Sequence, residues 1–276
     1  MKVRYLADPQ RFPRMTTKEL RETFLVENLF QAGKLEMLYS DTERAVVVGV
    51  VPTVEPLELQ GGKELASDFF AQRREAGVIN IGAPGAVTVD GESFVMAKLD
   101  CLYIGRGAKQ IQLSSSDPKN PAEFYLLSYP AHRSYPTKLI HKAEANQVEL
   151  GALKTSNERI IYQYIRPGIA ESCQLVMGLT ILADGSVWNT FPPHTHARRT
   201  EIYLYFDVGA DDRVFHIMGS PAETRHLVMQ NKEAVLSPSW SIHAGAGSGN
   251  YSFIWGMGGE NQEFDDMDHV KVDEIR

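Results

Sequence analysis

The stretch that decides the fold is Pro192-Pro193-His194-Thr195-His196-Ala197-Arg198-Arg199-Thr200-Glu201, in the C-terminal half of the chain. Two histidines two residues apart on an extended strand project from the same face of that strand. A turn through residues 197–200 can return the chain, so that Glu201 reaches the same point as the two imidazole rings. A second stretch, Pro238-Ser239-Trp240-Ser241-Ile242-His243, supplies a third imidazole just before Gly245 and Gly247.

Imidazole and carboxylate together form the ligand set expected for zinc, iron, manganese or nickel. We therefore predict a divalent-metal site with His194, His196, Glu201 and His243 as its ligands. The set contains no cysteine, which argues against a zinc finger. A coordination position left open for water or substrate distinguishes a catalytic metal site from a structural one.

The regions around these stretches consist of short apolar runs with turn residues about every ten positions, which favours an all-β sandwich, barrel or jelly roll. One helix is expected near the N-terminus, where Thr16 and Glu19 form a capping-box pattern. The last residues, 261–276, are expected to form a tail or a short helix. The predicted strands are residues 45–51, 77–82, 86–90, 101–104, 110–113, 123–129, 173–181, 201–206, 213–218, 226–229, 233–236 and 251–256.

A weak internal repeat suggests two related β-domains. Arg73-Arg74-Glu75 precedes one predicted strand, and Arg198-Arg199 followed by Glu201 precedes another. We place the domains at residues 1–148 and 149–276, joined near residues 136–155, where the polar segment 138–147 could form a linker or a helix.

The chain has 276 residues and a formal net charge of −7, from 28 basic and 35 acidic side chains. This balance gives no sign of the basic face that binds nucleic acid. The N-terminus lacks the apolar run of a secretory signal, and no stretch approaches the length of a membrane span. Cys101 and Cys173 are expected to be reduced thiols. We expect a cytoplasmic protein that binds neither nucleic acid nor membrane.

The pattern HxHxxxxE, followed some forty residues later by PxWxxH, resembles the two-part cupin signature. The family pattern often has glycine where Trp240 stands, and a glycine nearer to His194 than Gly185 is. The resemblance extends to the 5-keto-4-deoxyuronate isomerase family along nearly the whole chain. The matching segments are residues 21–30, 73–91, 103–109, 135–138, 172–175, 194–199, 237–245 and 253–270.

The resemblance implies an all-β tandem cupin fold, that is, two double-stranded β-helix or jelly-roll domains with a few short helices. It also implies one Zn²⁺ per chain on His194, His196, Glu201 and His243, and a homohexamer. The ligand types do not exclude iron, manganese or nickel. The first domain should be without metal, because the turn at residues 69–75 has no histidine and Lys109 or Gln110 stands where the late histidine would be.

The activity that the resemblance implies is a ketol isomerisation in pectin and unsaturated-uronate breakdown. It interconverts 5-dehydro-4-deoxy-D-glucuronate and 3-deoxy-D-glycero-2,5-hexodiulosonate, so the expected partner is a small ketouronate. Three alternatives stay open: a 5-deoxyglucuronate isomerase, an Fe(II) dioxygenase, and a non-catalytic sugar-binding cupin.

Such an isomerisation needs a general base and a cation for the substrate carboxylate. Candidate bases are Glu260, His132 and Tyr135, with His226 as a further one. Candidate carboxylate-binding residues are Arg198, Arg199, Arg166 and Lys138.

Other conspicuous side chains have structural interpretations. His216 is expected to be a core residue, and His269 to belong to an acidic run that is solvated or caps a helix. Trp188, Trp240 and Trp255 are expected in the core, with Trp240 close enough to His243 to wall the pocket.

Overall fold

A computed structural model describes all residues, 1–276, and divides the chain into two compact units. The first unit consists of Met1–Arg4, Asn28–Ala145 and Tyr164–Met177, and the second of Tyr5–Glu27, Asn146–Gln163 and Gly178–Arg276. The two units are therefore not two consecutive halves of the chain. The helix near the N-terminus and the short strand that follows it pack in the second unit. The predicted boundary at residues 148 and 149 itself stays a prediction.

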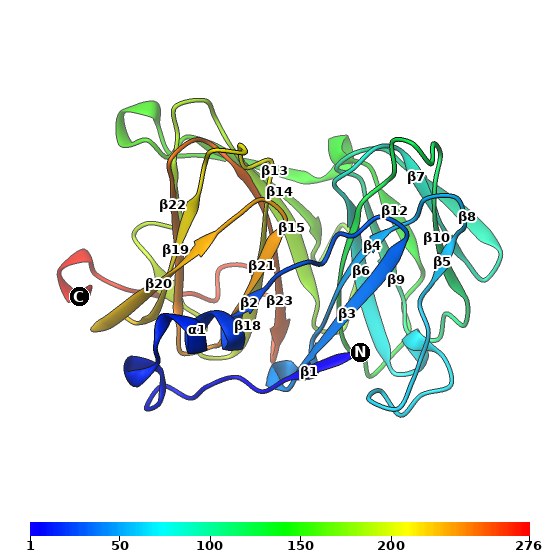
Figure 1. Cartoon of the computed structure of the whole chain (residues 1–276), viewed down its shortest axis with the longest axis horizontal. Coiled ribbons are helices and arrows are strands. Elements are labelled where there is room, and N and C mark those ends of the chain that lie inside the picture. The colour runs from blue at the N-terminus through cyan, green and yellow to red at the C-terminus, as the bar shows by residue number, and fades with distance from the viewer. The chain divides into compact units, whose positions relative to one another are not determined.

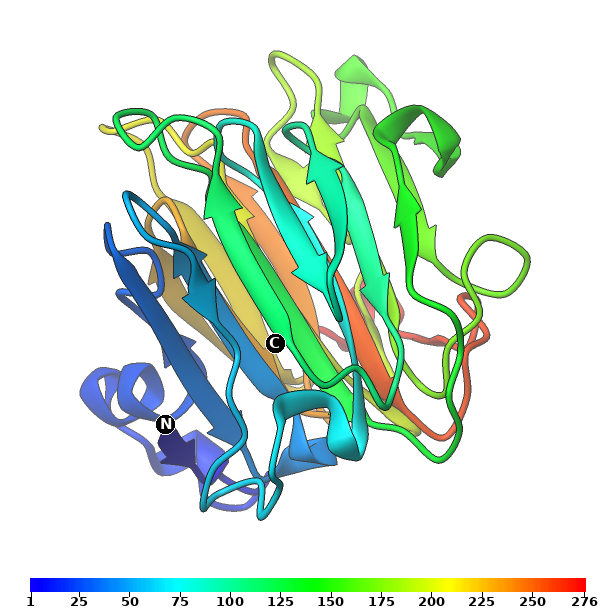
Figure 2. The same cartoon turned by 90° about the vertical axis from the view of Figure 1, so that its right-hand side faces the viewer.

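The first unit contains a seven-stranded sheet in the order β1-β3-β4-β11-β6-β9-β12 and a four-stranded sheet in the order β5-β10-β7-β8. Figure 2 shows the green strand β11 between the blue β4 and the cyan β6. The bounds of these strands are β1 Lys2–Arg4, β3 Lys34–Ser40, β4 Val46–Val51, β5 Leu57–Glu58, β6 Arg74–Asn80, β7 Gly85–Val89, β8 Glu92–Met96, β9 Cys101–Ile104, β10 Ile111–Ser115, β11 Phe124–Pro130 and β12 Lys138–Ile140.

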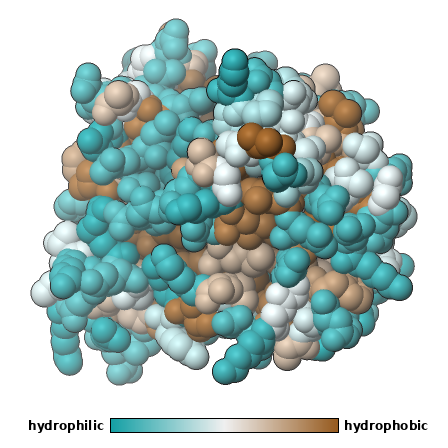
Figure 3. Space-filling view, turned by 45° about the vertical axis from the view of Figure 1, so that its right-hand side comes forward, coloured by the Kyte–Doolittle hydropathy of each residue, from teal (hydrophilic) through white to brown (hydrophobic).

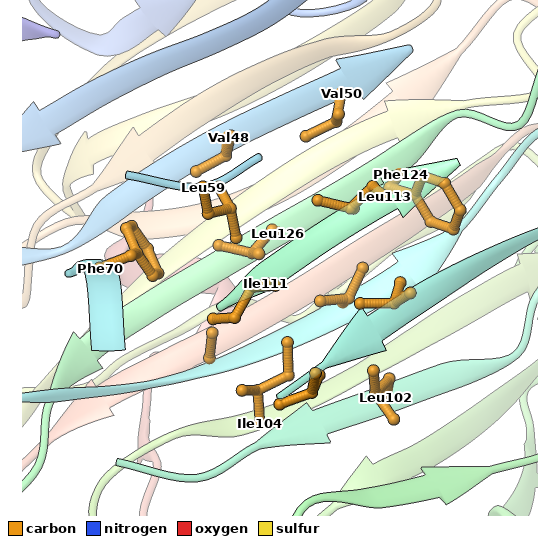
Figure 4. Close-up of a cluster of buried hydrophobic side chains, with 14 of the residues drawn as sticks. Val48, Val50, Leu59, Phe70, Leu102, Ile104, Ile111, Leu113, Phe124 and Leu126 are labelled. Carbon is orange, nitrogen blue, oxygen red and sulfur yellow. The ribbon is translucent and has the colours of Figure 1, made fainter. Parts of the chain in front are cut away.

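Alternate side chains of the first unit's strands fill the space between its two sheets (Figure 4). Val48, Val50 and Leu126 come from the seven-stranded sheet, and Ile111 and Leu113 from the four-stranded sheet. Each is at most 1% exposed, and burying a side chain of this size contributes about 1.5–3 kcal/mol to the free energy of unfolding. The alternation read from the sequence thus builds a two-layer core.

The second unit repeats this plan, with a seven-stranded sheet in the order β13-β14-β15-β23-β18-β21-β2 and a four-stranded sheet in the order β16-β22-β19-β20 (Figure 1). Strands β17 and β24 form a separate pair. The bounds are β2 Leu25–Val26, β13 Asn146–Leu150, β14 Arg159–Ile165, β15 Val176–Leu182, β16 Trp188–Asn189, β17 His194–Thr195, β18 Arg199–Phe206, β19 Val214–Ser220, β20 Glu223–Met229, β21 Glu233–Ser237, β22 Ile242–Gly247, β23 Ser252–Gly259 and β24 Asp268–His269.

The one α-helix, α1 (Thr17–Phe24), has the predicted capping box. The Thr16 side chain accepts a hydrogen bond from the Glu19 backbone N–H, and the Glu19 carboxylate accepts one from the Thr16 N–H. The helix packs against β20 and β21 of the second unit. The six 3₁₀ helices are Phe12–Arg14, Thr42–Arg44, Phe70–Gln72, Lys142–Glu144, Leu153–Thr155 and Val272–Glu274. No helix has the length and hydrophobicity needed to span a bilayer.

All twelve predicted strands are present within a few residues, and the all-β prediction is confirmed. The prediction of a linker or helix over residues 138–147 is wrong for most of that segment. It forms β12, a single 3₁₀ turn and the start of β13, because each strand finds an antiparallel partner, β9 for β12 and β14 for β13.

The internal repeat has a structural counterpart, with a shift of one residue. Strands β6 and β18 each begin with an arginine, Arg74 and Arg199, and each occupies the fifth place in its seven-stranded sheet. Aligned on these arginines, Glu201 corresponds to Ala76, a residue of the first unit's core. Glu75 lies on the other face of β6, since successive side chains of a strand point to opposite faces.

Polar groups share the interior of the second unit with aromatic rings. His216 is fully buried, and its Nδ1 lies 2.8 Å from the hydroxyl oxygen of Tyr205. The ring centroids of His216 and Tyr203 are 5.7 Å apart. His216 is therefore a core residue, as the sequence predicts, although its Nε2 has no hydrogen-bond partner.

The surface in Figure 3 is mostly hydrophilic, with smaller hydrophobic patches between the charged side chains. The large hydrophobic side chains that are more than a third exposed include Leu150 and Phe191 of the second unit.

Gly178 in β15 controls the packing of one wall of the second unit. A Cβ at this position would overlap the carbonyl oxygen of Tyr162 and the indole ring of Trp255. We predict that Gly178→Ala lowers the free energy of unfolding by about 1–3 kcal/mol, the usual cost of overpacking a core. Urea denaturation measures this change, and tryptophan fluorescence should report the displaced indole. Unchanged stability and emission would contradict the packing described here.

Burial lowers the pKa of His216 to about 3, and the nearby His243 adds to the shift. At pH values below 6.5, the ordinary pKa of histidine, the unfolded chain binds a proton at this residue and the native state does not. The stability contributed by neutral His216 is therefore complete above pH 6.5 and is lost as the pH falls toward about 3. The loss has a slope of up to about 1.4 kcal/mol per pH unit.

We predict that His216→Gln weakens this acid dependence, so that the stability difference between about pH 7 and about pH 5 shrinks by roughly 1–2 kcal/mol. Urea unfolding of wild type and variant at both pH values gives the comparison. An identical pH dependence in the two proteins would contradict the assignment.

Candidate metal centre

Three imidazoles and one carboxylate meet in the interior of the second unit. His194 lies on β17, Glu201 on β18 and His243 on β22, while His196 lies in the turn between β17 and β18. All four side chains are buried, and one ligand atom from each lies within 4.8 Å of the others. The structure thus assembles the predicted group from separate strands, although only His194 of the first two histidines is in a strand.

The distances between the ligand atoms suit a metal ion. His196 Nε2 and His243 Nε2 lie 2.9 and 2.8 Å from the Glu201 Oε2, and His194 Nε2 lies 3.1 and 3.0 Å from the Nε2 atoms of His196 and His243. Ligand atoms around a tetrahedral zinc are about 3.3 Å apart, given metal–nitrogen distances near 2.0–2.1 Å. The group can therefore hold a divalent ion with little movement of the side chains.

The pKa shifts of two members of the group, His194 and Glu201, favour metal binding. Burial lowers the pKa of His194 to about 2, so that imidazole is neutral at physiological pH. Burial alone would raise the pKa of Glu201, but the charge of His243 and hydrogen bonds from His196 and His243 bring that pKa well below its ordinary value. Neutral imidazoles and an ionised carboxylate are the forms that bind a metal.

A hydrogen bond outside the group orients His196. Its Nδ1 donates to the backbone carbonyl of Asp266 at 2.8 Å, so that Nε2 is the ring nitrogen that faces Glu201 and the centre of the group. Partners of this kind fix the tautomer and ring orientation of metal-binding histidines.

Arg198 and Arg199 hold the loop that carries Asp266. The Arg198 Nε donates to both Asp266 carboxylate oxygens at 2.7 and 2.9 Å, and its Nη2 to both oxygens of Asp268. The fully buried Arg199 donates to the carbonyls of Glu263 and Asp266 at 2.6 and 2.9 Å. The acidic segment expected to be solvated is therefore tied to the metal-ligand strand by ion pairs.

A cavity of about 520 Å³ opens beside His194, His196 and Glu201. Its walls are mainly apolar and aromatic, with a few hydroxyl groups and one guanidinium, as expected of a small-molecule site. The other lining residues are Leu150, Arg159, Ile161, Thr180, Thr190, Phe191, Pro192, Tyr203, Phe253, Trp255, Met257, Phe264, Met267, His269 and Val270.

The tryptophan predicted to wall the pocket is the wrong one, although Trp255 is a buried core residue as predicted. Trp240, predicted as a pocket wall, is absent from the lining and packs against Phe12, with ring centroids 5.2 Å apart. Trp255, predicted as core, lines the cavity and donates from Nε1 to the Thr180 hydroxyl at 3.2 Å. The reason is that β23 pairs directly with β18, so its side chains lie beside those of Glu201 and Tyr203.

None of the predicted catalytic or carboxylate-binding residues outside the metal group lines this cavity. Glu260 and His226 are exposed residues of the second unit. His132, Tyr135, Lys138 and Arg166 belong to the first unit. There, the Arg133 guanidinium lies 4.5 Å from the Tyr135 ring centroid, and the Lys138 Nζ donates to the Ile169 carbonyl. The proposed roles of these residues stay predictions.

Sequence reasoning missed Arg159 and undervalued His269, both of which line the cavity. The ring centroid of His269 is 6.2 Å from that of His194, because β24 pairs with β17. One signal for Arg159 was available: it begins the apolar run 159–165, two residues before Ile161 and hence on the same face of the strand.

Proteins of known name resemble this chain over its full length. A 4-deoxy-L-threo-5-hexosulose-uronate ketol-isomerase of Lachnoclostridium phytofermentans is 52% identical over 276 residues, covering all of both chains. Proteins with the same name from Shouchella clausii and Caldicellulosiruptor bescii are 51% and 49% identical, again over all of both chains.

Solved structures share the fold at low sequence identity. An IolB-like protein of Salmonella typhimurium matches with a TM-score of 0.70 and 13% identity, covering 87% of this chain and 94% of that one. An oxalate decarboxylase of Lactobacillus farciminis matches with a TM-score of 0.57 and 11% identity, covering 90% of each chain. These likenesses confirm the tandem cupin architecture. Together with a family model that matches residues 24–272 and relatives about half identical along the whole chain, they lead to one conclusion: the chain belongs to the KduI/IolB family.

Proposed function

We propose that this protein is a metal-dependent ketol-isomerase that interconverts 5-dehydro-4-deoxy-D-glucuronate and 3-deoxy-D-glycero-2,5-hexodiulosonate. The observation that carries the proposal is the group of three buried imidazoles and an ionised carboxylate at the edge of a 520 Å³ cavity. The names of relatives about 50% identical over their full length support the choice of substrate.

The metal that we propose is one Zn²⁺ per chain, bound by His194, His196, Glu201 and His243. A divalent ion in this position supplies Lewis-acid stabilisation of the negative charge that develops on substrate oxygens when a proton leaves the neighbouring carbon. The chain's own contribution is to hold the four ligand side chains close together in a buried position and to fix His196 through the Asp266 carbonyl. The apolar and aromatic walls limit water around the reacting carbons.

Three further assignments belong to the same proposal and rest on the family resemblance. The protein is expected to act in pectin and unsaturated-uronate breakdown, to be cytoplasmic and to assemble as a homohexamer. Light scattering coupled to gel filtration measures the assembly.

The direct test of the reaction is to supply the ketouronate to zinc-loaded protein and to follow both sugar forms by NMR. We expect interconversion that stops when a chelator removes the metal. No conversion by fully loaded protein would contradict the proposal. 5-Deoxyglucuronate serves as the competing substrate, and iron-dependent oxygen uptake would instead identify a dioxygenase.

We predict that His243→Ala removes most of the bound metal and the activity while leaving the fold nearly intact. The residue supplies one of four ligands, and the remaining three hold an ion much less tightly. Elemental analysis measures the metal, and circular dichroism checks the fold.

His141→Ala is the matched control, because His141 is an exposed histidine that does not line the cavity and has no proposed catalytic role. It should keep its metal and its activity. Full metal content in the His243 variant would show that the ligand set is different.

A further inference from the structure

Arg159 is the only arginine or lysine that lines the cavity beside the metal group. It begins β14, and its cross-strand partner on β13 is Leu150. Leu150 and Ile161, which lies two residues further along β14, also line the cavity. The guanidinium therefore enters the cavity through an otherwise apolar wall.

The structure gives this guanidinium a single hydrogen bond, from Nη1 to the backbone carbonyl of Asn157 at 2.8 Å. A guanidinium has five N–H donors, so most of its capacity is unused. Arg159 is half-buried, and this burial lowers the pKa of its guanidinium from the ordinary value. An arginine in a protein nevertheless keeps its charge at neutral pH.

No carboxylate balances this charge. The only acidic residue that lines the cavity is Glu201, and its Oε2 already lies within 2.9 Å of His196 and His243. Arg159 takes part in no ion pair, in contrast to Arg198, which meets Asp266 and Asp268. A partly buried cation without a counterion is costly to the folded chain, and an anionic ligand would offset that cost.

The position of Arg159 suits the far end of a ligand held at the metal group. In the seven-stranded sheet, β14 and β18 are separated by β15 and β23, so the two sites stand three strand spacings apart, roughly 14 Å along the sheet. Both side chains line the same cavity, so the ligand shape that we infer is an elongated acid with one end at Glu201 and the other at Arg159.

We propose that Arg159 binds the carboxylate of the substrate and sets the preference of this site for sugar acids over neutral sugars. The planar guanidinium can donate two parallel hydrogen bonds to a carboxylate, a geometry that lysine cannot reproduce. The identity of the acid rests on the proposed function. The preference for an anionic ligand rests only on the charge of Arg159, which no carboxylate in the cavity balances.

The first test compares kinetics of wild type, Arg159→Lys, Arg159→Gln and Arg213→Gln, each with its metal content and thermal stability measured. Arg213 is the matched control: it is a half-buried arginine of the same unit that donates to the backbone carbonyls of Ala210 and Asp212 and does not line the cavity.

We expect Arg159→Gln to lower kcat/KM roughly 30- to 300-fold, mainly through a higher KM, with metal retained. The kcat/KM of Arg159→Lys should lie between that of this variant and that of wild type. The kcat/KM of Arg213→Gln should equal that of wild type. A change in kcat/KM of less than about threefold in metal-loaded, folded Arg159→Gln would overturn the proposal.

The second test needs no turnover. Calorimetry or NMR titration of metal-free protein with D-glucuronate and with D-glucose measures the preference for the acid. We expect wild type to bind the acid more tightly and Arg159→Gln to lose this preference. Equal binding of the two sugars by wild type, or a preference kept in the variant, would overturn the proposal. A preference that is lost in the variant, in a wild type inactive on the ketouronate, would support Arg159 while rejecting the proposed reaction.

Discussion

The structure depends on one constraint, the burial of an ionised carboxylate inside the second unit. An unpaired charge in such a place would cost several kcal/mol, and Glu201 avoids this through His196 and His243 at 2.9 and 2.8 Å. Meeting that constraint requires strands far apart in sequence to converge. It also explains the two arginines that follow His196, since they tie down the loop whose carbonyl orients that ring.

The first unit shows the same scaffold with an apolar residue at the position that corresponds to Glu201. Where β18 has Glu201, β6 has Ala76 in an apolar core, and the nearby carboxylate of Glu75 faces the other side. There it accepts hydrogen bonds from the backbone N–H groups of residues 173–175 and from the Tyr103 hydroxyl, which use both of its oxygens. A shift of one residue along a strand thus separates a structural carboxylate from one in a group that could hold a metal ion.

The fold class and the pair His194 and His196 could be predicted because both follow local rules, whereas His243, some forty residues further on, was joined to them through the two-part cupin signature. Strand alternation and turn spacing are visible within ten residues, and the spacing of His194 and His196 is short. The residues of the cavity walls were harder to predict, since they depend on which strands are neighbours in the sheet. Trp240 is near His243 in sequence but packs on Phe12, whereas Trp255 reaches the cavity through the pairing of β23 with β18. Arg159 was missed for the same reason.

The central claim is that one metal ion and one sugar acid share this cavity. Anomalous X-ray diffraction from crystals of zinc-loaded protein with the bound ketouronate tests it most directly. The account predicts one zinc peak per chain, about 2.0–2.2 Å from the Nε2 atoms of His194, His196 and His243 and the Glu201 Oε2, with a substrate oxygen in the open position. A zinc peak elsewhere, or no peak at these four side chains, would contradict it.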